Sequence, residues 1–226
     1  MQSKNIEELI SQKVKASDLY KDALTHRSAG NSNNERLEFL GDAVLGLIVG
    51  EYLYKKFPED DEGGLSRKRA YLVRKETLQK IAQDNDLGSM LNLGKGERKS
   101  GGRNRASIIS DALEAIIGVI FIIDGLIESQ RFVLALFSNF LDNIPIEDDL
   151  KDPKTKLQEI LQSRKNDLPT YETDELNQGE KERFLTRCII SQYSITEVGR
   201  GKSKRESQQD AALKTLEILK EKFKEK

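Results

Sequence analysis

Acidic residues interrupt one of the most apolar stretches of the chain. Residues 34–54 read NERLEFLGDAVLGLIVGEYLY, and the carboxylates of Glu35, Glu38 and Asp42 lie among its aliphatic side chains. If this stretch is helical, the spacing places all three on one stripe roughly 60° wide. A carboxylate in apolar surroundings is costly unless a partner pairs or neutralises it, so the stripe predicts a nearby cation.

A second apolar stretch repeats the pattern. Asp111 and Glu114, within residues 107–123, are three positions apart and therefore share a helix face. Asp and Glu without His or Cys form the ligand set of a hard divalent cation, Mg²⁺ or Mn²⁺. The single histidine, His26, has no partner at the spacing of a zinc site, and the chain lacks the Glu-x-x-His pattern of a di-iron bundle.

The alternative is a set of structural salt bridges. Arg27, Arg36 or the basic run SRKR at 66–69 could pair the acids, and for one isolated buried carboxylate that interpretation is the better one. Two apolar helices with matching acidic stripes favour a bound metal instead. Gly41, beside Asp42, adds to this because glycine permits close backbone approach, although helix packing alone also explains a glycine there.

Composition points to no particular partner and to no membrane span. The chain has 226 residues, a formal net charge of -1, 33% charged residues and a mean hydropathy of -0.59. Its longest apolar run, 115–123, ends at Asp124, short of membrane-spanning length. The N-terminus lacks the apolar core of a signal peptide, and Cys188, the one cysteine, cannot form an internal disulfide. We therefore expect a cytoplasmic protein without a membrane segment.

Two modules follow one another along the chain. Residues 1–145 are expected to be all-α, 146–151 a polar linker, and 152–226 a small α+β domain. Helices in the first module are predicted at 18–28, 34–55, 66–85, 107–123 and 128–144. The fourth of these is apolar nearly all round, which is typical of a buried central helix.

The second module is predicted to have the order α-β-β-β-α. Asp152 followed by Pro153 is the pattern of a helix start, and Ser203 with Glu206 forms a capping box at the beginning of the last helix. Alternating polar and apolar residues between these helices predict three antiparallel strands. The strands are expected at 170–176, 183–190 and 194–201.

Five segments together resemble the bacterial ribonuclease III family, in the family's order. They are LTHRS (24–28), NERLEFLGDAVLG (34–46), GGLSRKRAYLV (63–73), GERKSGGRNRASIISDALEAIIG (96–118) and DPKTKLQEILQ (152–162). The resemblance implies an all-α endonuclease domain that forms a homodimer, followed by a double-stranded-RNA-binding domain. It implies hydrolysis of duplex RNA with Mg²⁺, for which Mn²⁺ can substitute, giving 5′-phosphate and 3′-hydroxyl ends with short 3′ overhangs. It also implies a role in rRNA and mRNA processing.

The resemblance assigns roles to the acids as well. The positions that match the family's metal ligands are Glu38, Asp42, Asp111 and Glu114. We expect Asp42 and Glu114 to be the catalytic pair, with the other two acting directly or through water. Glu35, and Glu62 in the following loop, are implied to lie near the subunit junction and the RNA. One site per chain cuts one strand, so two chains related by a two-fold axis would cut both. The apolar helix at 37–49 either supplies that interface or is an ordinary buried core helix.

Basic residues cluster where the last helix begins. Lys202, Lys204 and Arg205 surround a helix N-terminus, where free backbone N–H groups favour phosphate. In a domain of α-β-β-β-α order, this cluster is predicted to bind duplex RNA by shape. The resemblance adds minor-groove contacts from Thr155, Gln158 and Glu159 and from the loop 177–181.

The chain departs from the family in two places. The loop 177–181 lacks the histidine that is common there, and KRESQ (204–208) has Ser207 and Gln208 where the family has Ala and Lys. The basic run at 94–105 either touches phosphates or is a solvated loop.

Two other functions remain open: a protein that binds duplex RNA without cutting it, and a structural protein that docks on a ribosome. Neither has a use for five aligned acids, so the endonuclease is favoured.

Overall fold

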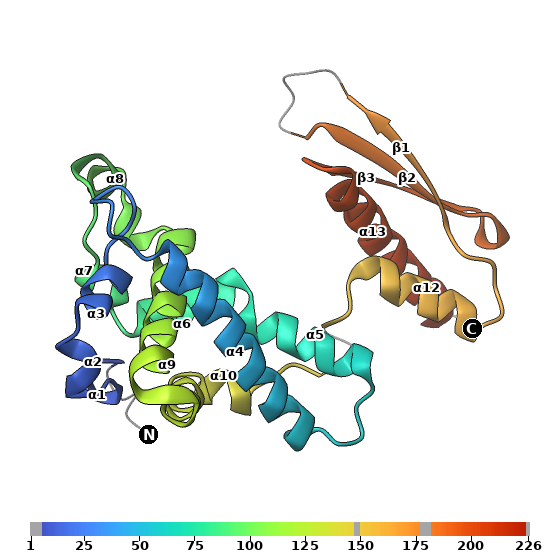
Figure 1. Cartoon of the computed structure of the whole chain (residues 1–226). Coiled ribbons are helices and arrows are strands. Elements are labelled where there is room, and N and C mark those ends of the chain that lie inside the picture. The colour runs from blue at the N-terminus through green and yellow to red at the C-terminus, as the bar shows by residue number, and fades with distance from the viewer. Residues whose placement is uncertain (1–5, 147–149, 177–181, 225–226) are drawn as a thin grey trace. The chain divides into compact units, whose positions relative to one another are not determined.

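The computed structural model describes residues 6–146, 150–176 and 182–224, and the chain divides into two units, Met1–Pro145 and Ile146–Lys226. Part of the predicted linker, 147–149, and the predicted contact loop 177–181 lie outside the described residues. Each unit has its own hydrophobic core. Figure 1 labels the elements of both.

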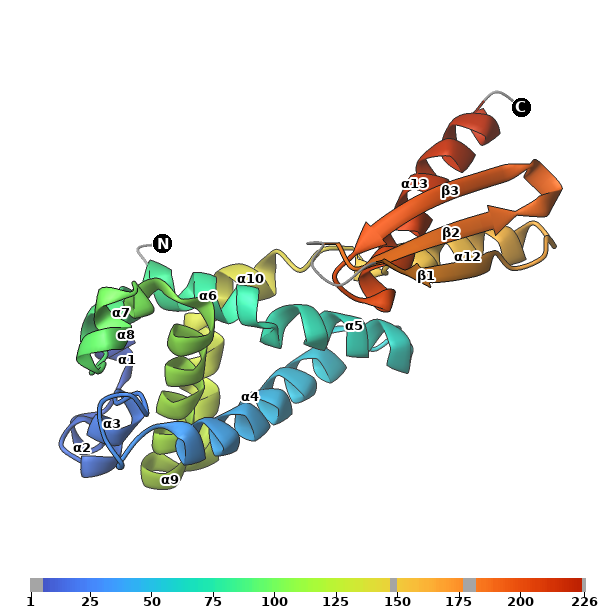
Figure 2. The same ribbon diagram turned by 90° about the horizontal axis from the view of Figure 1, so that it is seen from above.

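The described part of the N-terminal unit is helical, which confirms the predicted all-α domain. Its elements are α1 (Ile6–Leu9), α2 (Gln12–Lys15), α3 (Asp18–Ala23), α4 (Glu35–Lys56), α5 (Glu62–Val73), α6 (Lys75–Asp84), α7 (Leu87–Met90), α8 (Lys95–Lys99), the 3₁₀ turn η1 (Gly102–Asn104), α9 (Ala106–Leu136) and α10 (Ser138–Asp142). The two longest helices, α4 and α9, pack against each other, and α6 packs on α9 (Figure 2). The core of the unit lies around this crossing.

Several helix boundaries differ from the prediction. The helix predicted at 18–28 ends at Ala23. The predicted helix 66–85 is broken at Arg74, which has extended backbone angles between α5 and α6. The Thr77 hydroxyl donates to the carbonyl of Tyr71, and the Arg74 guanidinium lies 4.6 Å from the Tyr71 ring centroid. These contacts stabilise the corner without a glycine or proline. The helices predicted at 107–123 and 128–144 are carried by α9 and α10. As predicted, a break falls between them, at Gly125 within α9, where φ is 84°. The second predicted helix is divided again at Phe137, between α9 and α10.

The element α9 continues past Asp124, the residue that ends the longest apolar run of the sequence. It is the one helix among the described residues that is long and apolar enough to cross a membrane, and 61% of its most apolar window is buried in the protein. Its buried side chains pack against α4 and α6 in the core of the unit. This packing is typical of the central helix of a helical domain.

Of the two alternatives for the apolar helix at 37–49, the ordinary buried core helix is wrong. Phe39, Leu47 and, further along α4, Tyr54 are 81%, 58% and 73% exposed. The reason is that α4 packs against α9 and α5 with its other side, which carries residues such as Leu45 and Ile48. A helix that is apolar all round therefore has one buried face and one open apolar face here.

The described part of the C-terminal unit confirms the order α-β-β-β-α. Its elements are α12 (Pro153–Ser163), β1 (Thr170–Glu175), β2 (Phe184–Ile190), η2 (Ser191–Tyr193), β3 (Ile195–Gly201) and α13 (Lys204–Lys224). The antiparallel strands follow the order β1-β2-β3, and the central Cys188 pairs with Tyr171 on one side and Glu197 on the other. Both helices cover one face of the sheet (Figures 1 and 2). Leu157, Leu161 and Cys188 lie in the core between these layers.

Both predicted helix starts of this unit are present. Asp152 accepts a hydrogen bond from the Thr155 backbone N–H at 3.2 Å, with Pro153 as the first helical residue. Ser203 accepts one from the Glu206 N–H at 3.1 Å, and the Glu206 carboxylate accepts one from the Lys202 N–H. These caps satisfy backbone donors that a helix start leaves unpaired.

Candidate functional site

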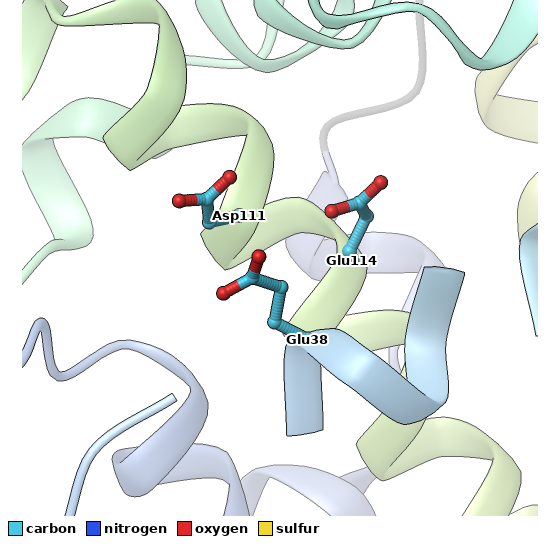
Figure 3. Close-up of side chains that lie close together, drawn as sticks. All are labelled: Glu38, Asp111 and Glu114. Carbon is cyan, nitrogen blue, oxygen red and sulfur yellow. The ribbon is translucent and has the colours of Figure 1, made fainter. Parts of the chain in front are cut away.

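Three of the predicted acids converge where α4 and α9 cross. Glu38 comes from α4, and Asp111 and Glu114 come from α9. One carboxylate oxygen from each residue can be chosen so that all three lie within 4.8 Å of one another. Figure 3 shows the three side chains pointing toward a common space. Oxygens at this spacing can share one small cation.

Glycines allow the two helices to come this close. A Cβ atom added to Gly118 of α9 would lie 2.5 Å from the carbonyl oxygen of Leu37 in α4, which is closer than real Cβ atoms come to other atoms. Gly41 faces α9 in the same way. The interpretation that Gly41 serves close backbone approach is therefore confirmed, and here close approach and helix packing are one effect.

The three carboxyl groups of the cluster hold their protons more tightly than exposed carboxyl groups do. Burial raises the pKa of Glu114 to about 8, with smaller contributions from Asp42, Asp111 and Glu38. Burial also raises the pKa of Glu38, with Asp111 as the next cause, and burial raises the pKa of Asp111. Shifts in this direction mean that the protein alone does not neutralise these carboxylates.

Basic side chains pair only with acids at the edge of the cluster, Asp111 and the neighbouring Glu35. Lys75 Nζ lies 4.0 Å from an Asp111 oxygen, and Arg27 pairs with Glu35 at 3.3 Å. Within the described ranges, no ion pair reaches the carboxylate of Glu38 or Glu114. The salt-bridge alternative therefore accounts for the margin of the cluster and not for its centre.

The other predicted acids lie outside this group of three. Asp42 is exposed, one helical turn beyond Glu38 on α4, although it is the largest charge contribution to the raised pKa of Glu114. Glu35 is one turn before Glu38 and faces Arg27. Glu62 begins α5 and accepts a hydrogen bond from the Ser66 hydroxyl at 2.7 Å. The role of Asp42 as a metal ligand and the roles of Glu35 and Glu62 stay predictions.

The donor set fits a hard divalent cation. The three side chains offer only carboxylate oxygens, the ligands that Mg²⁺ and Mn²⁺ prefer, and the described surroundings contribute no cysteine. A cation in this position would stabilise the ionised carboxylates against the burial and the smaller charge repulsion that raise the Glu114 pKa. The residues present therefore fit such an ion.

The second candidate region is the basic end of α13. Lys202, Lys204 and Arg205 are all exposed, and none takes part in an ion pair with another described residue. Unpaired cations at a helix start can meet phosphate directly. The C-terminal unit thus has a free cationic surface at the predicted place.

The predicted contacts on α12 are partly engaged within the unit. The Thr155 hydroxyl donates to Asp152 at 2.9 Å, and Glu159 pairs with Lys151 at 2.6 Å. Gln158 is half-buried on the same helix. Their contacts to RNA stay predictions.

Two features of these sites have no local signal in the sequence. Lys75 lies 36 positions from Asp111 along the chain, so no local spacing links them. Ser207, noted only as a departure from the family pattern, is fully buried, and its hydroxyl lies 2.7 Å from the Thr186 hydroxyl. Both relationships depend on how distant elements pack.

Both units match known protein families. The family model described as Ribonuclease-III-like matches residues 16–140, and the model of the double-stranded RNA binding motif matches 153–219. The chain is 41% identical over 220 residues to Ribonuclease 3 of Glaesserella parasuis serovar 5, covering 97% of this chain and 99% of the relative. It is 46% identical over 216 residues to Ribonuclease 3 of Azotobacter vinelandii, covering 95% and 94%.

Solved structures agree with this comparison for the N-terminal unit. The nuclease domain of ribonuclease III from Campylobacter jejuni is 47% identical, with a TM-score of 0.54, over 61% of this chain and 97% of that chain. A second structure of that domain is 46% identical with a TM-score of 0.55, over 60% and 99% of the two chains. It is described as flexible in a region involved in dimer formation.

Proposed function

The chain belongs to the ribonuclease III family and is a double-stranded-RNA endonuclease, and on that premise we propose that it cuts with Mg²⁺ held by its carboxylate cluster. The products are 5′-phosphate and 3′-hydroxyl ends with short 3′ overhangs. Mn²⁺, with the same preference for oxygen ligands, can take the place of Mg²⁺. The single observation that supports the metal is the convergence of Glu38, Asp111 and Glu114 within 4.8 Å.

The protein's contribution to the reaction is to position charge. Glu38, Asp111 and Glu114 would hold the cation, and burial raises the pKa of Glu114 to about 8. Asp42, exposed beside Glu114, would be the second member of the catalytic pair and a further ligand. The ion, when bound, would activate water and stabilise charge on the leaving 3′ oxygen.

The RNA is held by the C-terminal unit. A duplex is recognised by its A-form shape, through phosphates and minor-groove contacts. The exposed cations Lys202, Lys204 and Arg205 contact phosphates across the major groove, and Thr155, Gln158 and Glu159 face a minor groove. The free cationic start of α13 supports the first of these assignments.

The active form is a homodimer. The exposed residues of α4, Phe39, Leu47 and Tyr54, fall on one side of that helix by their spacing, and Phe39 and Ile122 of α9 line one groove. Large exposed apolar patches mark interaction sites. The description of dimer formation in the related nuclease domain supports a second copy as the partner. Two sites related by a two-fold axis would then cut both strands.

The proposed cellular role is the processing of rRNA and mRNA in the cytoplasm. The family to which the chain belongs supports this assignment. Duplex regions of precursor RNAs are the substrates that such an enzyme cuts.

The test is cleavage of a defined RNA hairpin, with the ends mapped. The parent protein with Mg²⁺ should give the stated ends, and none in EDTA. Glu114→Gln should bind the duplex and leave it uncut. Glu128→Gln, which removes an exposed carboxylate of the same helix that pairs with Arg131, is the matched control and should cut normally. Equal cutting by Glu114→Gln and the parent would contradict the proposed site, and intact RNA with the parent would favour a protein that only binds.

A further inference from the structure

A basic residue of α6, Lys75, lies beside the carboxylate cluster of Glu38, Asp111 and Glu114. It is the first residue of that helix, and its Nζ lies 4.0 Å from Asp111 Oδ1. The Lys75 side chain is 67% exposed, whereas that of Asp111 is 25% exposed. An exposed cation therefore lies at the edge of the site.

The charge of Lys75 acts on all three carboxylates of the cluster. Its proximity lowers the pKa of Glu38, Asp111 and Glu114, in each case against the larger effect of burial. A second nearby cation, the guanidinium of Arg27, already pairs with Glu35. Lys75 takes part in no ion pair with a described residue other than Asp111.

We propose that Lys75 is the counter-ion of the carboxylate cluster in the metal-free protein and competes with the divalent cation for Asp111. This inference rests on the proposed function, because it assumes that the cluster binds Mg²⁺. A contact at 4.0 Å between an exposed ammonium and a carboxylate is weak, so Lys75 can move into solvent when a divalent cation takes its place. Lys75 is thus a positioning residue that sets the metal concentration the enzyme needs.

The charge arithmetic gives the direction of the effect. Lys75 repels an incoming cation and also holds Asp111, so its removal should tighten metal binding. For a single charge at this distance in a largely solvated site, the gain is about three- to tenfold in the dissociation constant. In the metal-free protein the same change leaves the carboxylates without their nearest cation, so it should lower stability.

The experiment measures Mg²⁺ binding to the full chain by calorimetry, without RNA. Lys75→Gln removes the charge and keeps most of the side chain, and it should bind Mg²⁺ about three- to tenfold more tightly than the parent. Lys75→Arg keeps the charge and should bind close to the parent value. Lys80→Gln is the matched control, because Lys80 is on the same helix and pairs with Asp84. It should leave the affinity unchanged.

Thermal melting provides the second measurement. In EDTA, Lys75→Gln should melt about 1–2 °C below the parent. At saturating Mg²⁺ the difference should vanish, whereas a merely structural role would lower both melting temperatures equally. Unchanged or weaker Mg²⁺ binding by Lys75→Gln would overturn this inference while leaving the endonuclease intact. A parent protein that cuts RNA without binding Mg²⁺ would overturn the proposed metal site itself.

Discussion

The backbone of Gly41 touches the backbone of Glu114. A Cβ atom added to Gly41 would lie 1.7 Å from the Glu114 carbonyl oxygen, a distance no side chain can adopt. The position of Glu38, one turn before Gly41, is therefore fixed relative to Asp111 and Glu114 by a contact that needs glycine. The geometry of the metal site depends on this crossing.

Gly41→Ala should consequently damage both the fold and the site. Separation of α4 from α9 by an added methyl group should cost about 1–3 kcal/mol or more in the free energy of unfolding. It should also weaken Mg²⁺ binding, because the carboxylates move apart. Calorimetry and urea unfolding measure the two effects.

Gly46→Ala on the same helix is the control for this change. A Cβ atom at Gly46 meets nothing within 4 Å, so the substitution should leave Mg²⁺ binding unchanged. It should raise stability by about 0.5–1 kcal/mol, since alanine favours a helix. Equal effects of the two substitutions would contradict the role of the crossing.

The raised pKa of Glu114 predicts how stability depends on pH in EDTA. Its pKa is raised from an ordinary value of 4.5 to about 8, so the folded protein binds this proton more tightly than the unfolded chain. The resulting stability is fully present below about pH 4.5 and is lost as the pH rises through about 8. The melting temperature of the metal-free protein should therefore fall across this range, and Glu114→Gln should flatten the fall.

The affinity for Mg²⁺ should change with pH in the opposite direction to the stability of the metal-free protein. The cation binds the ionised carboxylate, so its affinity should rise with pH up to about 8 and its binding should release protons. Calorimetry in buffers of different ionisation enthalpy counts those protons. A proton release that is the same in the parent and in Glu114→Gln would show that another group titrates.

Substitution of Phe39 should dissociate the dimer. Phe39 is 81% exposed and lines a groove with Ile122, so Phe39→Ser removes a large apolar contact between two copies. A central aromatic contact contributes about 2 kcal/mol or more to such an interface, which corresponds to a rise of at least thirtyfold in the dissociation constant.

Sedimentation across a range of concentrations measures this effect. The control is Leu168→Ser in the C-terminal unit, where a leucine that is 51% exposed lies outside the proposed interface. It should leave the association unchanged. A parent protein that is monomeric at all concentrations would contradict the homodimer.

The sequence predicted the features that depend on neighbouring residues. Asp152 and Ser203 mark helix starts because a cap needs only the next three residues. Asp111 and Glu114 share a face because the helix repeat requires it. The strands follow from alternation, since Thr186, Cys188 and Ile190 are buried in β2 and the residues between them are more exposed.

Features that depend on distant packing were not predictable in this way. Nothing in the composition of α4 distinguishes the exposed Phe39 from the buried Leu45, because both are large and apolar. The break at Arg74 carries no glycine or proline to reveal it. The approach of Lys75 to Asp111 requires α6 to pack on α9, which no local pattern contains.

Loss of the basic cluster on α13 should reduce both RNA affinity and its salt dependence. Each phosphate contact contributes about 0.7–0.9 to the slope of log affinity against log salt. Joint substitution of Lys202, Lys204 and Arg205 by Gln should lower this slope by roughly 2–3. Lys220→Gln, which removes an exposed charge far along the same helix, should change it little. A slope that is flat for the parent protein would contradict phosphate contact by the cluster.

Ser207, which stands where the family has alanine, should stabilise the fold of the C-terminal unit. Hydroxyl groups form a chain from Thr173 through Thr186 to Ser207, with oxygen separations of 2.8 and 2.7 Å, and the Ser207 hydroxyl donates to the Lys204 carbonyl. This chain links β1 and β2 to the start of α13. Thr186→Val removes its central member and leaves two hydroxyls with one partner fewer.

We expect Thr186→Val to destabilise the C-terminal unit by about 1–3 kcal/mol, the usual cost of leaving buried polar groups unsatisfied. Hydrogen exchange of the β2 and α13 amides measures this cost within the full chain. Thr196→Val, on the exposed face of β3, is the control and should change exchange little. Because the chain of hydroxyls holds the start of α13 against the sheet, Thr186→Val should also weaken RNA binding without removing any charge. Unchanged exchange in Thr186→Val would show that packing alone positions the basic cluster.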